Sequence, residues 1–240
     1  MKTTSTIEDS AKLALSASLC LVFVIAGCAS GPPKSGFLGN YSNFEKVRDD
    51  APLWDFADPT GEKRDSRRVE LWRDVSGLTK LGQYERIIVE PAVLRLQKDS
   101  RGVHIDPAML NELAQYAHDS LVTALQDRYP VADQPGQGVL RFRVAITDVY
   151  PSDVFVQDQS NTAQVANSSA GGGTIEGEAV DSVSGDRVFG IIGTIKGSRW
   201  DAVREQGDDW KQTKSSIAAM ARFVRELMDR AQSGALEQPS

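Results

Sequence analysis

Four carboxylates in the second half of the sequence could perform acid–base chemistry: Asp148, Glu176, Glu178 and Asp181. Two carboxyl groups held about 5–9.5 Å apart in a cleft can serve as the acid and the nucleophile or base that cleave a glycosidic bond. A carboxylate-based hydrolase of cell-wall glycan is therefore one alternative for this chain. Carboxylates spread over a flat, exposed sheet would count against it.

A second chemistry to consider is cation binding by Asp148, Asp153 and Asp158, because hard cations such as Ca²⁺ take oxygen ligands. The spacing does not follow the Asp-x-Asp-x-Asp-Gly pattern of a calcium loop, and Asp is also a common turn residue. The histidines, His104 and His118, are expected in structural or surface roles. We therefore expect no metal, no cofactor and no enzymatic activity.

The N-terminus carries the clearest motif. Residues 13–26 form an apolar run that is shorter than the about 20 residues of a membrane-spanning helix and typical of a signal-peptide core. It ends in Ile25-Ala26-Gly27-Cys28, which matches the lipobox of bacterial lipoproteins. The motif predicts a signal peptide over 1–27, cleavage between Gly27 and Cys28, and lipidation of Cys28.

Processing at this site determines the location and the thiol content of the mature chain. Bacterial lipoproteins resemble the multiply acylated case, in which membrane anchoring is stable. Ala29 replaces the Asp that retains such proteins in the inner membrane of enteric bacteria, so we expect the outer membrane and a domain facing the periplasm. Cys20 leaves with the signal and Cys28 carries the lipid, which excludes thiol catalysis and disulfides.

The charge balance excludes a further class of partner. The chain has 27 Lys plus Arg against 33 Asp plus Glu, a formal net charge of −6. The signal peptide contains two basic and two acidic residues, so the mature chain keeps this charge. An acidic surface does not attract nucleic acid.

Composition divides the mature chain into four parts. Residues 28–36 are small, Pro or Gly after the Cys, apart from one Lys, and predict a flexible tether with a reach of about 25 Å at roughly 3.3 Å per residue. Residues 37–83 are rich in aromatics without clean periodicity, and we expect an irregular segment docked on the domain. Residues 84–233 predict an α/β domain, and 234–240 a disordered tail.

Hydrophobic periodicity within the domain predicts the order strand, helix, three strands, helix. The expected strands are 86–91, 140–147, 174–183 and 187–196, and the helices run from Asp106-Pro107 to about Arg128 and from 209–212 to about Ala231. We expect a single α/β domain with a mixed, largely antiparallel sheet and two packed helices. Between the second and third strands lies a polar stretch, 151–173, long enough to be functional or disordered. If it joins an antiparallel pair, Glu176 and Glu178 share a sheet region with Arg141 and Arg143.

Several short motifs together resemble one family. They are Phe37-Leu38-Gly39-Asn40-Tyr41, Tyr84 with Ile87-Ile88-Val89-Glu90-Pro91, Pro135-Gly136, Ala145-Ile146-Thr147-Asp148, Glu176-Gly177-Glu178, Asp181-Ser182 with Gly185, and Trp200. These residues are similar to the uncharacterised bacterial lipoprotein family called domain of unknown function 3313, over nearly all of the mature chain. Asn40 departs from the Asp of that family. The resemblance implies a lipid-anchored envelope protein and supplies no reaction and no catalytic residue.

The sequence thus favours a non-catalytic lipoprotein that binds or scaffolds another envelope component, either a protein or peptidoglycan. A purely structural lipoprotein that links membrane to wall is a further alternative, and it predicts high abundance. The expected binding surface comprises the segment near the anchor and the polar loop, with the residues Phe37, Leu38, Tyr41, Asp148, Asp153 and Asp158.

Overall fold

The computed structural model describes residues 31–47, 68–98, 100–153, 169–196 and 210–235. The elements, in chain order, are β1 (Glu45–Lys46), β2 (Arg68–Asp74), η2 (Leu78–Gln83), β3 (Arg86–Val89), β4 (Val93–Leu94), η3 (Arg101–His104), α1 (Pro107–Leu125), β5 (Val139–Asp153), β6 (Ser169–Asp181), β7 (Arg187–Lys196) and α3 (Lys211–Gln232). All of them belong to one unit of the chain, Pro32–Ser240. The expected signal peptide 1–27 and most of the tail, 236–240, lie outside the described residues.

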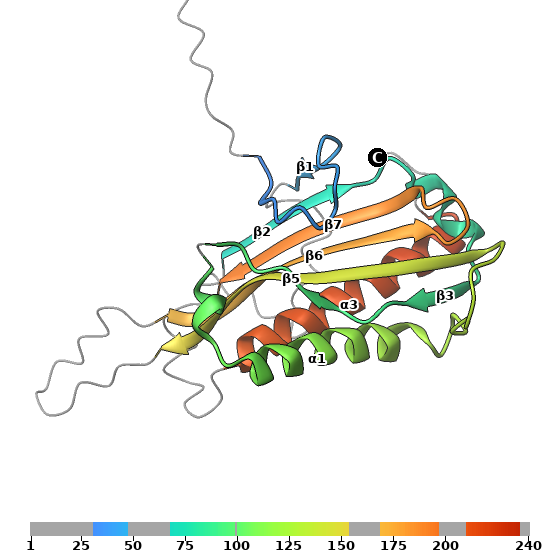
Figure 1. Ribbon diagram of the computed structural model, residues 1–240. Coiled ribbons are helices and arrows are strands. Elements are labelled where there is room, and N and C mark those ends of the chain that lie inside the picture. Colours follow the sequence, from blue (N-terminus) through green and yellow to red (C-terminus); the bar gives the residue numbers. More distant parts are fainter. Residues whose placement is uncertain (1–30, 48–67, 99, 154–168, 197–209, 236–240) are drawn as a thin grey trace, which may run out of the picture. The chain divides into compact units, whose positions relative to one another are not determined.

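The strands form a seven-stranded sheet with the order β1-β2-β7-β6-β5-β3, and β4 also pairs with β5 (Figure 1). Only β3 and β4 run parallel to their neighbour β5, and the pairs among β1, β2, β7, β6 and β5 are antiparallel. The prediction of a mixed, largely antiparallel sheet with two packed helices is confirmed. Among the described residues, no helix is both long and apolar enough to cross a membrane.

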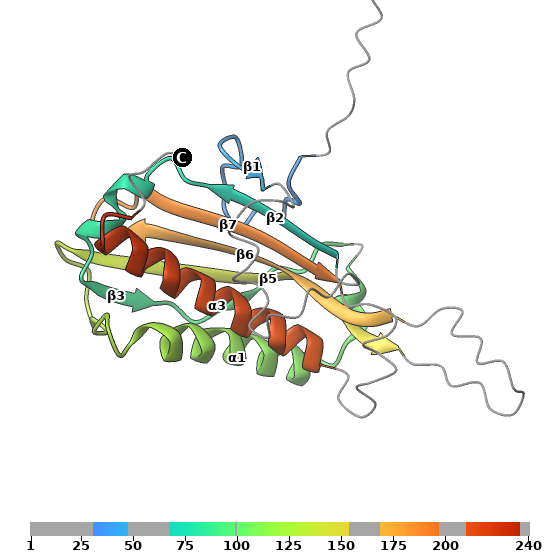
Figure 2. The same ribbon diagram turned by 180° about the vertical axis from the view of Figure 1, so that it is seen from behind.

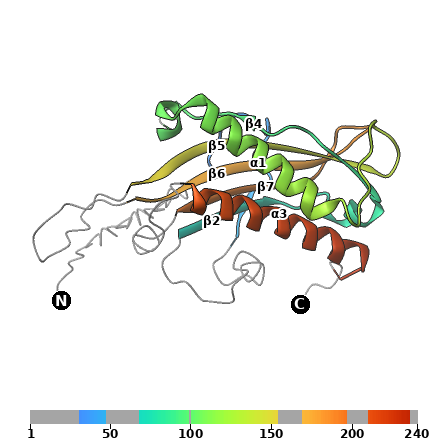
Figure 3. The ribbon, with the colours of Figure 1, turned by 90° about the horizontal axis from the view of Figure 1, so that it is seen from below.

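Both helices cover the same face of the sheet (Figures 2 and 3). The side chain of Asp106 accepts a hydrogen bond from the Ala108 amide at 2.8 Å and caps α1, as the Asp-Pro pair predicts. Helix α3 begins after Trp210, which provides no side-chain cap. The buried side of α1 comprises Leu110, Leu113, Ala114, Ala117, Leu121 and Leu125. These residues and the apolar positions of β5, β6, β7 and α3 form the main core.

Residues 37–83 are more regular than expected, because they contain β1, β2 and η2. Strand β2 pairs with β7 over its whole length, so the sheet extends beyond 84–233. Leu71 and Trp72 are adjacent and both buried, one in the helix-side core and one in a separate cluster on the opposite face. Burial of two adjacent residues interrupts the alternation that marks a half-exposed strand, which explains why the sequence did not predict β2.

The polar stretch 151–173 is also shorter than expected. Strand β5 continues to Asp153 and β6 begins at Ser169, and the two remain paired there. Residues 154–168 lie outside the described residues. At the other end of the domain, Gly234 and Ala235 follow α3 in a turn, in which the Ala235 amide donates to the Arg230 carbonyl at 3.0 Å.

Candidate functional site

The face of the sheet opposite the helices, here called the outer face, binds the N-terminal strap, residues 35–44. Side chains alternate along β6, so Ile175 faces the helices and Glu176 faces the strap. The Ser35 amide donates to Glu176 Oε1 at 3.0 Å, and the Tyr41 hydroxyl donates to Oε2 at 2.7 Å. Glu176 is 0% exposed, and the strap provides a donor to each of its carboxylate oxygens.

Arg187 of β7 holds the strap through its backbone. Its Nη2 donates to the Leu38 carbonyl at 2.6 Å, and its Nη1 donates to the Asn40 carbonyl at 2.9 Å. The same guanidinium pairs with Glu178 through Nε at 2.8 Å and with Asp74 through Nη1 at 3.2 Å. One arginine therefore joins three strands of the sheet to the strap.

The charges beneath the strap alternate across the sheet. Arg143 Nη1 pairs with Glu178 at 2.6 Å, so the row reads Arg143, Glu178, Arg187, Asp74. Burial raises the pKa of Asp74, but hydrogen bonds from Ser76 and Arg187 outweigh burial, and the pKa lies below its ordinary value. The row is neutral in sum. Glu178 and Asp74 have side chains only 5% and 2% exposed, so removing Arg187, their shared partner, leaves buried charge uncompensated, which costs about 3–5 kcal/mol.

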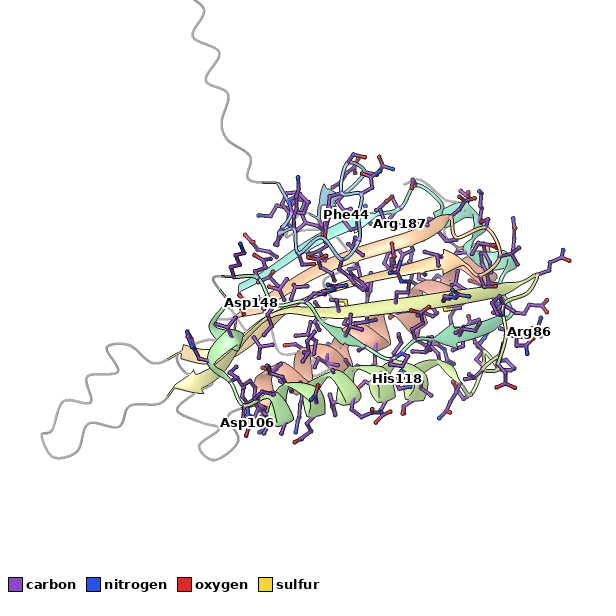
Figure 4. The ribbon with its side chains drawn as sticks, in the orientation of Figure 1. Phe44, Arg86, Asp106, His118, Asp148 and Arg187 are labelled. Atoms are coloured by element: carbon purple, nitrogen blue, oxygen red, sulfur yellow. The ribbon has the colours of Figure 1, made fainter. Side chains whose placement is uncertain are left out.

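Aromatic side chains of the strap cover this row. The Phe37 ring stacks on the Arg143 guanidinium, with 5.3 Å between the ring centroid and Cζ. The Phe44 ring stacks on the Arg187 guanidinium in the same way, at 5.4 Å. Figure 4 shows Phe44 and Arg187 side by side over the outer face. Gly190 makes room for both, because a Cβ there would lie 2.6 Å from Phe44 Cζ. The strap and sheet share a small apolar cluster of Leu38, Phe44, Trp72 and Ile192.

The structure brings together three of the six residues predicted as a binding surface. Phe37, Leu38 and Tyr41 all lie in the strap, where they face the sheet. Asp148 lies elsewhere and accepts a 2.6 Å hydrogen bond from Ser100 Oγ. Asp153 is the last residue of β5, and only its backbone is described. The sixth residue, Asp158, falls outside the described residues.

The four carboxylates considered for glycan hydrolysis occupy separate surroundings. Glu176 and Glu178 lie under the strap, and Asp148 contacts the N-cap of η3. Asp181 accepts the amides of Val183 and Ser184 at 2.9 and 2.8 Å and the Tyr84 hydroxyl at 3.0 Å, and so fixes the β6–β7 turn. These bonds, the Ser184 amide first, lower the pKa of Asp181. All four carboxylates accept hydrogen bonds from the protein itself.

No group of three or more His, Cys, Asp or Glu side chains in the described ranges has the arrangement to hold a metal ion. His104 is exposed at the end of η3. The Nδ1 of His118, on α1, lies 3.1 Å from the Glu90 carbonyl oxygen. Neither histidine has a described contact with the four carboxylates.

Two cavities differ in what they could hold. A cavity of about 40 Å³ lies between the helices and the sheet, and mainly apolar side chains such as Leu121, Phe142 and Val224 line it. It offers few groups that could orient a ligand. A larger cavity of about 180 Å³ lies beside the strap. Its walls combine charged and apolar residues: Gly36, Phe37, Glu90, Pro91, Val93, Arg95, Arg143 and Val144.

Sequence reasoning missed Asp74, Glu90, Arg95 and Arg187 as members of this region. It did anticipate that Arg143 shares a sheet region with Glu178, and the strand register confirms that they are direct partners. The sequence does contain a signal for these residues, because charged residues at alternating positions of neighbouring strands lie on one face of the sheet. No comparable signal assigns the strap to that face.

A mixed sheet with two helices on one face and a docked N-terminal segment on the other defines an α/β domain whose outer face is partly covered by its own chain. The family described as "Protein of unknown function (DUF3313)" matches residues 62–224, and the chain belongs to this family. The resemblance drawn from the motifs is confirmed. The matched range includes the 145–148 motif but not the 37–41 motif, so it is narrower than expected.

Solved structures of similar fold come from several bacteria. The PelC dodecamer from Paraburkholderia phytofirmans has 14% identity and a TM-score of 0.36, covering 68% of this chain and 97% of that chain. A candidate neuraminyllactose-binding hemagglutinin homologue from Helicobacter pylori has 14% identity and a TM-score of 0.35, covering 65% and 91%. A candidate lipoprotein from Caulobacter crescentus has 14% identity and a TM-score of 0.29, covering 69% and 99%. A comparison with curated proteins gives no match.

Proposed function

We propose that this chain is a non-catalytic lipoprotein, anchored through Cys28 in the outer membrane and facing the periplasm, that binds another envelope component, a protein or peptidoglycan. The lipobox Ile25–Cys28 supports the anchor, and Ala29 supports the outer membrane. Membership of the family agrees with the envelope protein that the motifs imply.

The observation that supports the proposal is that the candidate catalytic carboxylates are already engaged in hydrogen bonds and ion pairs within the protein. A glycosidase needs one carboxyl group free to act on the substrate and a second one at a defined distance from it. Here the two adjacent glutamates, Glu176 and Glu178, are 0% and 6% exposed and bind strap and arginine groups. The same groups that could cleave a glycan serve to hold the strap on the outer face, which supports binding over catalysis.

Anchoring is tested by replacing the lipidated residue. Cys28→Ala should move the protein from the membrane fraction to the soluble periplasmic fraction or leave it as unprocessed precursor. Ser30→Ala, in the tether but outside the lipobox, is the matched control and should fractionate like the wild type. Unchanged membrane association of Cys28→Ala would contradict the lipid anchor.

The binding role is tested in living cells by crosslinking the anchored protein and identifying what it captures. A reproducible envelope component that is lost in the Cys28→Ala strain supports the proposal. Absence of catalysis is tested with purified peptidoglycan. We expect no release of soluble glycan fragments, and release that disappears in Glu176→Gln would establish a hydrolase instead.

A further inference from the structure

The cavity beside the strap combines a volume of about 180 Å³ with charged walls. It is bounded by the strap on one side and by residues 90–95, which follow β3 and include β4, on the other. Its volume of about 180 Å³ is more than ten times the about 10–15 Å³ that one water needs. The cavity can therefore admit a ligand group of several atoms.

The charged groups of this cavity have unused hydrogen-bonding capacity. Arg95 is exposed and makes no ion pair with a described residue, while its amide donates to the Ile146 carbonyl at 2.9 Å and fixes its position beside β5. Arg143 Nε lies 3.8 Å from Glu90 Oε2, and Arg141 Nη1 lies 3.6 Å from Glu90 Oε1. Both separations exceed hydrogen-bond distance, so the Glu90 carboxylate can still accept a bond from a ligand.

Positive charge is in excess at the cavity, because Arg143 is balanced by Glu178 and Arg141 by Glu90, while Arg95 has no ion pair with a described residue. This is the reverse of the whole chain, which carries a net charge of −6. Guanidinium groups bind carboxylates through two parallel hydrogen bonds, a geometry that neutral ligands cannot reproduce. The charge of the wall therefore selects an anionic group.

The remaining wall is apolar and partly exposed. Val93 is 41% exposed, and Pro91 and Phe37 lie beside it in the cavity lining. A ligand that places a small apolar side chain against Val93 would bury this surface. The combination of an excess of cations, one acceptor for an N–H group and an apolar wall matches the last residue of a peptide: carboxylate, amide and short side chain.

We propose that this cavity binds the free carboxylate end of a peptide whose last residue has a small apolar side chain. Arg95 and Arg143 hold the carboxylate, Glu90 accepts the amide of the last residue, and Val93 packs against its side chain. This inference rests on the proposed function and names the chemical class of the envelope component. A protein C-terminus and a peptidoglycan stem peptide both present this chemistry, with the L and the D configuration respectively.

The strap also belongs to the site, because Gly36 and Phe37 form one wall of the cavity. A ligand that contacts this wall binds more tightly to the protein when the strap is docked than when it is undocked. Binding and strap docking are therefore linked, and each stabilises the other by the same factor.

The test uses the purified full chain in detergent and measures binding by NMR titration with N-acetyl-L-alanine, N-acetyl-D-alanine and N-acetyl-L-alanine amide. We expect at least one of the acids to bind about tenfold more tightly than the amide, because the amide lacks the charge that both arginines recognise. The preferred enantiomer identifies the source of the ligand, L for a protein and D for peptidoglycan.

Arg95→Gln is the decisive variant, because Arg95 takes no part in the ion pairs under the strap, and it should weaken acid binding about tenfold. The matched control is Arg86→Gln, since Arg86 is also exposed but donates to the Gln137 carbonyl at the far end of the sheet (Figure 4). Equal binding of acid and amide, no binding of either acid, or an unchanged affinity in Arg95→Gln would overturn the inference. Inorganic phosphate binding as tightly as the acids would also overturn it.

These results are independent of anchoring. Failure of the titration leaves the fractionation of Cys28→Ala unaffected, so it contradicts the ligand class and not the proposed function. Loss of the anchor in the fractionation test leaves the titration in detergent unaffected. The fractionation therefore tests the anchor and the titration tests the ligand class, and either result can be negative without the other.

Discussion

Tyr41→Phe is the smallest change that tests how the strap is held. The Tyr41 hydroxyl donates to Glu176 Oε2 at 2.7 Å and accepts the amides of Gly36 and Leu38 at 3.0 and 3.4 Å. Burial and the adjacent Glu176 carboxylate raise the pKa of Tyr41 above its ordinary value, so the hydroxyl keeps its proton at neutral pH. The variant removes this donor and keeps the ring.

The expected effect follows from the charge and burial of the acceptor. A hydrogen bond to a charged group contributes about 1.5–3 kcal/mol, and Glu176 is fully buried, so water does not replace the donor while the strap is docked. We expect docking to weaken by about 2 kcal/mol, which raises the population of the undocked strap about 30-fold. Glu176 retains the 3.0 Å bond from the Ser35 amide, so the loss is partial.

Hydrogen exchange of backbone amides measures this population directly. The Ser35 amide should exchange about 30-fold faster in Tyr41→Phe, while the amide of Leu113, in the middle of α1, should keep its wild-type rate. Tyr116→Phe is the matched control, because the Tyr116 hydroxyl has no hydrogen bond to a described residue. Unchanged exchange at Ser35, or equal acceleration at Ser35 and Leu113, would show that the strap is not an independently docked segment.

Three further predictions address other parts of the fold. Gly190→Ala should accelerate exchange in the strap without changing any charge, because the new Cβ would lie 2.6 Å from Phe44 Cζ. Burial and the hydrogen bond to Asp181 raise the pKa of Tyr84 from 10.0 to about 12. The protonated Tyr84 hydroxyl therefore stabilises the fold fully below pH 10, and this contribution is lost as the pH rises from about 10 to about 12. Tyr84→Phe should therefore reduce the alkaline fall in the urea midpoint, and an unaltered fall would contradict this. Leu113→Ala should lower the free energy of unfolding by about 2–5 kcal/mol, measured in urea, because Leu113 is 0% exposed in the core.

The helix-side half of the fold could be predicted from the sequence, because its signals are local. Apolar spacing and the Asp106-Pro107 cap predicted α1, alternation predicted β5, and the turn at 184–186 predicted the hairpin of β6 and β7. Strand β2 failed the alternation criterion because Leu71 and Trp72, which are adjacent and face opposite sides of the sheet, are both buried. A pattern of period two requires one exposed face, and the strap buries Trp72 on the face that would otherwise be exposed.

The candidate site was predictable only in part, because its partners are distant along the chain. An antiparallel pairing of 140–147 with 174–183 correctly predicted that Glu176 and Glu178 share a sheet region with Arg141 and Arg143, and both glutamates were among the four carboxylates considered for hydrolysis. The groups that occupy Glu176, the Ser35 amide and the Tyr41 hydroxyl, lie 141 and 135 residues away. Spacing within one strand cannot reveal such distant partners. From the sequence alone, Glu176 and Glu178 are therefore equally consistent with a catalytic role and with a structural one.

The shared wall of strap and cavity gives a final prediction that joins the two findings. A ligand that binds only the docked state stabilises it by RT ln(1 + [L]/Kd), about 2.7 kcal/mol at a concentration of 100 Kd. This exceeds the about 2 kcal/mol that Tyr41→Phe removes. N-acetylalanine of the preferred configuration, at about 100 Kd, should therefore return Ser35 exchange in Tyr41→Phe to near the wild-type rate, whereas the amide analogue at the same concentration should not. Rescue that persists in Tyr41→Phe combined with Arg95→Gln would show that the ligand acts elsewhere, since Arg95 contacts the ligand and not the strap bonds.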